Sequence, residues 1–168
     1  MPRRYRKPIR RSPANDPQQY LVYRMEKEAL GARGYAKVTR DILRQFTRGT
    51  CRSFGVPQVK LRFCDIGPWT GDYQDNLIRL NPKRPGSQCL LTIAHELGHH
   101  VHEALAPGND HESHGPQFMA AYMAVLDNAR ILPVVGMRAI CDQYGIRYND
   151  PGTTNSLRAL ARAVKSPA

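Results

Sequence analysis

Three absences narrow the classes of protein to which this chain of 168 residues can belong. It has no apolar run near the ~20 residues that a membrane-spanning helix needs. Its four cysteines are widely separated and form no C-x-x-C pair, which excludes the usual zinc-ribbon spacing and argues against a disulfide framework. The basic N-terminus has no apolar segment behind it, so it does not resemble a secretory signal. We therefore expect a cytoplasmic protein with reduced thiols that is neither secreted nor inserted in a membrane.

Acidic residues are also scarce, and the imbalance is uneven along the chain. The net charge is +11, from 25 Lys and Arg against 14 Asp and Glu. Residues 1–52 hold 14 of the basic residues but only 4 of the acidic ones, so this part alone carries +10. Arginine dominates there, and guanidinium groups pair well with phosphates. DNA or RNA is a candidate partner through residues 3–11 and the first helices. A solvated tail and an acidic membrane or protein surface are the alternatives.

The chain is predicted to form one folded domain behind a basic arm. Its length suits a single hydrophobic core. Residues 1–15 are basic, contain prolines and have almost no apolar side chains, which is typical of a segment that stays disordered until it binds. The folded domain is expected to span residues 16–168.

The spacing of apolar residues predicts an α+β arrangement. Asp16 and Ser87 are placed to cap helices, and a third strand is expected around Tyr73. The remaining elements, in chain order, are helices at 16–30 and 38–54, strands at 59–65 and 76–82, and helices at 87–105, 116–129, 134–144 and 154–165.

All six histidines lie between positions 95 and 114, and the first of them begins an H-E-x-x-H motif, HELGH at 95–99. His95 and His99 are four residues apart in a predicted helix, so both imidazoles lie on one face and can bind one ion. Neutral imidazoles around an open position suit zinc. Glu96 is rotated by about 100° from His95. Its carboxylate should lie beside the ion, where it can act as general base toward a bound water.

A catalytic zinc needs a third protein ligand, and the sequence offers several candidates. His100 points to another side of the helix, so the ligand should come from after the chain reverses near Pro107. The candidates there are His111, Glu112 and His114. His114 stands just before a helix that begins with proline, where its side chain is held in place, whereas the other two lie in a polar loop. A metal centre requires fixed ligands, which favours His114.

The two motifs together, HELGHH at 95–100 and HGPQF at 114–118, resemble the SprT-like zinc metallopeptidases. That family includes the Spartan proteases, which degrade proteins crosslinked to DNA, and small bacterial and phage metallohydrolases. The resemblance covers about residues 35–130. The chain has no cysteine zinc ribbon of the kind that bacterial SprT proteins often carry, so it resembles the smaller type.

The resemblance implies a zincin-like (minigluzincin-like) single domain with N-terminal helices, a small β-sheet, an active-site helix and an HGP-x-F helix. It also implies one zinc ion bound by His95, His99 and His114, with Glu96 as the catalytic base. DNA repair does not follow from the motifs, because a fold and a site do not determine a substrate.

These patterns predict a zinc metalloendopeptidase whose protein or peptide substrates include nucleic-acid-associated proteins. A substrate peptide is expected to pair with an edge strand near residues 76–81. A donor to stabilise the oxyanion is not identified; Tyr122 and His111 are weak candidates, and core packing is the expected role of Tyr122. The alternative functions are a nucleic-acid-binding protein with a structural or vestigial zinc site, and a metallohydrolase with a non-peptide substrate.

Overall fold

The computed structural model describes residues 16–31, 35–105 and 112–150. The predicted arm, the predicted helix at 154–165 and His111 lie outside the described residues. Within the described ranges, helices and a small sheet form an α+β domain, as the sequence predicts. None of the described helices is long and apolar enough to cross a membrane.

The elements follow the predicted order, with shifted boundaries. They are α1 (Gln19–Met25), the π-helical turn η2 (Glu26–Leu30), α3 (Arg40–Phe54), β1 (Lys60–Phe63), β2 (Gly71–Gln74), β3 (Leu77–Leu80), α4 (Leu90–Leu105), α5 (Pro116–Asn128) and α6 (Val134–Tyr144).

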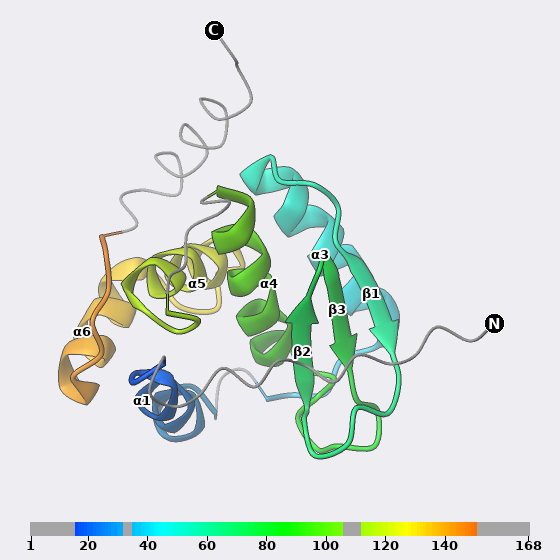
Figure 1. Ribbon diagram of the computed structural model, residues 1–168, viewed down its shortest axis with the longest axis horizontal. Helices are drawn as coiled ribbons and strands as arrows, with labels where there is room; N and C mark the ends of the chain where they lie inside the picture. Colours follow the sequence, from blue (N-terminus) through cyan, green and yellow to red (C-terminus); the bar gives the residue numbers. More distant parts are fainter. Residues whose placement is uncertain (1–15, 32–34, 106–111, 151–168) are drawn as a thin grey trace, which may run out of the picture.

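The three strands lie in the order β1-β3-β2, with β3 parallel to β1 and antiparallel to β2 (Figure 1). The predicted third strand around Tyr73 is thus confirmed as β2. Asp75 and Asn76 both have positive φ angles, as a tight two-residue hairpin turn requires, and this turn folds β2 back onto β3. The prediction that residues 76–81 form an edge was wrong. β3 is the central strand, with Ile78 and Leu80 buried, and the edge near α4 is β2.

Helix α4 lies at the centre of the domain, between the sheet and α5 (Figure 1). Gly98 explains how closely α5 can approach it. A Cβ atom at Gly98 would lie 3.1 Å from side-chain atoms of both Phe118 and Tyr122. A glycine that weakens the helix locally therefore allows the two helices to pack together.

The helix caps differ from those predicted. Thr39 caps α3, since its hydroxyl accepts a hydrogen bond from the backbone N–H of Ile42. Asp16 makes no side-chain cap to α1, because its carboxylate is bound to His114 instead. Ser87 does not cap α4 either. Its hydroxyl is buried with no hydrogen-bond partner in the part of the chain that the structure describes, and the helix begins only at Leu90.

Candidate metal centre

Three histidines, two from α4 and one from the turn before α5, lie close together. His95 and His99 lie one turn apart on α4, and His114 precedes α5. The Nε2 atom of His95 is 3.2 Å from Nε2 of His99 and 3.2 Å from Nε2 of His114. His95 and His114 are almost fully buried, with 6% and 3% of their surfaces exposed. This set could hold a metal ion.

The spacing of the three side chains fits a small divalent ion. Two nitrogen ligands about 2.05 Å from a tetrahedral ion are about 3.3 Å apart, close to the two separations around His95. No fourth His, Cys, Asp or Glu joins this set within the described ranges. Three protein ligands and an open fourth position are the arrangement found in catalytic rather than structural zinc sites.

Two buried carboxylates bind the outer nitrogens of these rings. Nδ1 of His95 lies 2.7 Å from Oε1 of Glu26, and Nδ1 of His114 lies 2.6 Å from Oδ2 of Asp16. An ionised carboxylate only accepts hydrogen bonds, so each Nδ1 must carry the proton. In each neutral ring, the Nε2 lone pair is then left facing the shared point.

The same carboxylates shift the proton affinities of the rings. Burial acts to lower the pKa of His95, but the adjacent charge of Glu26 outweighs it and raises the pKa to about 9. Burial lowers the pKa of His114, and the hydrogen bond with Asp16 opposes this only in part. The carboxylate beside each ring thus favours a cation there, whereas burial opposes it.

Glu96 lies beside this centre but is not part of the ligand set. It is buried, with 6% of its surface exposed, and it faces the sheet: a Cβ atom at Gly71 of β2 would lie 3.1 Å from its Oε1. Burial raises the pKa of Glu96 to about 7, while the nearby His95 opposes the shift. The carboxyl group thus has a proton affinity suited to exchanging protons near neutral pH.

Two aromatic rings border the histidines. Phe118 of α5 stacks on His99 with ring centroids 4.3 Å apart, which holds that imidazole in place. Tyr23 of α1 contacts both His95 and His114, with centroids 5.6 and 5.2 Å apart, and 42% of its surface is exposed. Burial and the charge of Glu96 raise the pKa of the Tyr23 hydroxyl, which therefore stays protonated and able to donate.

The other candidates have different surroundings. Glu112 binds Arg147 rather than joining the histidine set. His100 is buried on another side of α4, where its Nε2 lies 2.8 Å from the carbonyl oxygen of Pro57. Tyr122 is fully buried in the core, as predicted. Among the three candidates for the third position, the described residues bring only His114 to the cluster.

The sequence did not reveal Asp16, Glu26 and Tyr23 as parts of this site. All three lie outside the two histidine motifs, and each has an ordinary local interpretation as a cap or a helix-surface residue. The only local signal was that Tyr23 and Glu26 stand three apart on one helix face, which many helices share. Their placement depends on contacts across 69 to 98 positions of sequence.

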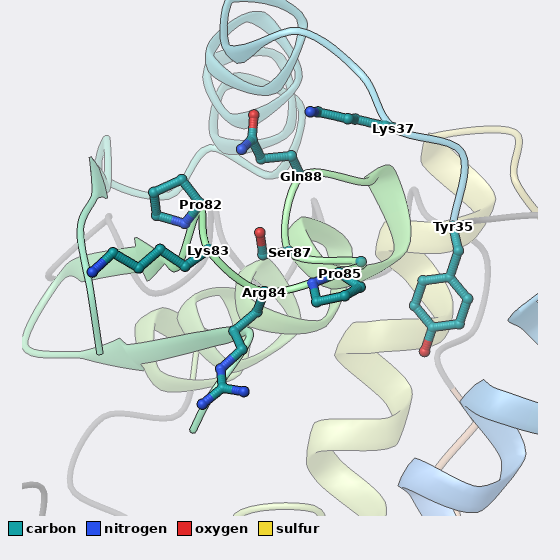
Figure 2. A pocket seen from close by; sticks show the side chains of 9 residues that line it. Tyr35, Lys37, Pro82, Lys83, Arg84, Pro85, Ser87 and Gln88 are labelled. Carbon is teal, nitrogen blue, oxygen red and sulfur yellow. The ribbon is translucent and has the colours of Figure 1, made fainter. Parts of the chain in front are cut away.

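A hollow of about 220 Å³ lies where the chain passes from β3 to α4 (Figure 2). Lys37, Lys83 and Arg84 contribute to its lining, and none of the described residues that line it is acidic. Lys83 is paired with Asp65, and Arg84 donates to the carbonyl of Gly67, so two of these cations are already engaged. None of the clustered histidines lines this hollow, which is separate from the metal centre.

Comparison with models of known protein families, with curated proteins and with solved structures finds no match for this chain. The function must therefore be inferred from the geometry of the site itself.

Proposed function

We propose that this protein is a zinc-dependent metallopeptidase of zincin-like, SprT-like type, in which Glu96 is the general base. His95, His99 and His114 would hold the zinc ion. The observation that carries the proposal is the pairing of a buried three-histidine cluster with a separate buried carboxyl group one residue after the first ligand.

The zinc ion, when bound, would lower the pKa of a water molecule and polarise the scissile carbonyl group. Glu96 would take a proton from the attacking water and deliver it to the nitrogen of the leaving amine. Burial next to Gly71 keeps the carboxyl group away from bulk water. Tyr23, whose ring contacts two of the histidines, is the described hydroxyl best placed to donate to the oxyanion.

A structural zinc site fits these residues less well. Structural sites usually have four protein ligands, and no fourth candidate joins the three histidines in the described ranges. A structural site also has no use for a buried carboxyl group beside the ion. The three-histidine set and the buried carboxyl group would also fit a hydrolase whose substrate is not a peptide. The argument for a peptide substrate therefore comes from the β-sheet.

One edge of the sheet supports a peptide substrate. Among the described strands, β2 pairs only with β3, on one of its two sides, and it contacts α4. An extended peptide that added to the other side of β2 would pass Gly71 and hence Glu96. This replaces the edge near residues 76–81 that the sequence suggested.

We also infer that nucleic acid is a partner, through α3. Its exposed arginines, Arg40, Arg44, Arg48 and Arg52, recur every four residues. They form a stripe with a rise of about 6 Å per step. Like charges at this spacing repel one another in a helix, so the stripe slightly destabilises the free protein. Phosphates would remove that repulsion.

The test is to measure zinc content and the cleavage of casein by mass spectrometry for wild type and for Glu96→Gln. Wild type is expected to bind about one zinc and to cleave. The variant should retain the zinc and lose at least about a hundredfold in rate, because the general base is gone.

Glu28→Gln is the matched control, since Glu28 is an exposed carboxylate paired with Arg24 on the surface. It should behave as wild type. Equal cleavage by wild type and Glu96→Gln would contradict the assigned base, and zinc binding without cleavage of any protein would favour a non-peptide substrate.

A further inference from the structure

We propose that Asp16 and Glu26 are positioning residues of the metal centre, which make the N-terminal segment 16–30 an integral part of it. Each would fix the ring orientation and the proton of one histidine, and together they would match the charge of a divalent ion. The inference rests on the metal centre of the proposed function but not on peptide hydrolysis.

The geometry assigns one carboxylate to each of two histidines. Asp16 binds His114 twice, since Oδ1 accepts from the backbone N–H at 3.2 Å and Oδ2 lies 2.6 Å from Nδ1. Glu26 lies 2.7 Å from Nδ1 of His95. Asp16 and Glu26 are 5% and 8% exposed. Such buried carboxylates are not surface groups that happen to lie near a ring.

The segment that carries these residues is itself fastened to the site. The side chain of Gln18 donates to the carbonyl oxygens of His114 and Arg147 and accepts from the backbone N–H of Arg147. Gln18 is only 3% exposed. The chain around position 18 is thus bound to the loop that supplies the third histidine, which holds Asp16 in register with it.

The N-terminal helix changes from α-helical to π-helical winding at Glu26, the residue that carries the second carboxylate. α1 ends at Met25, and the π-helical turn begins at Glu26. π turns are rare and frequently occur at functional sites. The carboxylate of Glu26 also lies near the buried Tyr122 hydroxyl, whose pKa it raises together with burial. Glu26 therefore sits between α4 and α5, where a charge is costly unless it is compensated.

A divalent ion would provide that compensation. Three neutral imidazoles carry no charge, so an ion of charge +2 is balanced by the two carboxylates that touch the ring nitrogens. The carboxylates should therefore raise the affinity of the site for the ion more than they raise the stability of the metal-free fold.

The isosteric variants Asp16→Asn and Glu26→Gln test this. An amide can donate to Nδ1, which favours the wrong tautomer with a proton on Nε2, so the fold can keep its hydrogen bond while the ligand is lost. Zinc affinity, measured by competition with a chromophoric chelator, is expected to fall about 10- to 100-fold in each variant and further in the double variant.

Two further readouts separate positioning from a structural role. The thermal midpoint should fall more in the zinc-loaded variants than in the metal-free variants, each compared with wild type in the same state. The visible absorption of the cobalt(II)-loaded protein, which depends on ligand geometry, should change in both variants. Glu28→Gln, two residues from Glu26 and exposed to solvent, is the control and should leave all three measurements unchanged.

Wild-type zinc affinity in both variants would overturn the inference. So would variants that fail to fold, or whose thermal midpoints fall as much without zinc as with it, because the carboxylates would then serve the fold alone. Failure of the proposed peptidase function looks different: wild type would bind zinc and cleave nothing, and the two variants would still lose zinc.

Discussion

Helices α3 and α4 use polar residues in opposite ways. On α4, His95, Glu96 and His100 are buried. His95 lies within hydrogen-bonding distance of the Glu26 carboxylate, and His100 lies within that distance of the carbonyl oxygen of Pro57. On α3, the polar surface is a stripe of exposed arginines. The buried groups on α4 have specific partners in other parts of the fold, whereas the arginines on α3 are exposed, with Arg40 and Arg44 lying over the ring of Phe63.

The role of a polar or charged residue depends on whether it is buried or exposed. A buried polar group must be paired, so its partners identify what it does. An exposed charge is screened by water and salt, so it acts through the number and spacing of its neighbours. Single substitutions should therefore have large effects on α4 and small effects on α3.

The largest effect is expected at the third histidine. His114→Ala removes a ligand itself, so zinc affinity should fall by more than the ~10- to 100-fold that loss of an outer partner produces. Isothermal titration with zinc measures this directly. His111→Ala, three positions earlier in the sequence, is the matched control and should bind zinc as wild type does; an equal loss in both variants would mean that the third ligand is misassigned.

His100 is a buried histidine of α4 that lies outside the metal centre. His100→Gln should leave zinc affinity unchanged, because its ring faces Pro57 and Tyr73 rather than the cluster. It should lower the free energy of unfolding by about 1–3 kcal/mol through the loss of buried hydrogen bonds. Urea denaturation measures the stability. A large loss of zinc in this variant would contradict the division of α4 into two faces.

A matched pair of glycines compares the packing of the two helices. Gly98→Ala on α4 should destabilise the protein by about 1–3 kcal/mol, because the new methyl group meets Phe118 and Tyr122 at 3.1 Å. Gly49→Ala on α3 has no atom within 4 Å of the new Cβ. It should stabilise by about 0.5–1 kcal/mol through higher helix propensity. Urea denaturation measures the free energy of unfolding of both variants. A change of the same sign in both would contradict the comparison.

The smallest effect per residue is expected on α3. Replacement of Arg40, Arg48 and Arg52 by Gln should weaken binding to single-stranded DNA at low salt and lower the slope of log affinity against log salt by about 2–3. Stability should change by no more than a few tenths of a kcal/mol. Fluorescence anisotropy over a range of salt concentrations measures the binding.

A variant that removes the same charge elsewhere tests whether position matters. Arg24, Arg130 and Arg138 lie outside α3, and their replacement by Gln should alter the slope less. If both triple variants weaken binding equally, only the net charge attracts nucleic acid and the stripe has no special role.

Much of the candidate site was predictable because it depends on local periodicity. The four-residue spacing of His95 and His99 places them on one helical face wherever that helix lies. The α+β arrangement follows in the same way from the change between helical and alternating patterns. Strand order was not predictable, since no local pattern records which strands pair, and only the pairing shows that β3 is central.

The sequence alone determined that two histidines would share a helix face with a glutamate beside them, and that arginines would line one side of α3. These features depend on 3.6 residues per turn and on nothing else. Only the tertiary structure decided that His114 reaches the same point, that Asp16 and Glu26 lie behind the histidines, and that His100 belongs to the core. Those contacts join segments as many as 98 positions apart. They are selected by burial and by the need to pair every buried charge, which no local pattern records.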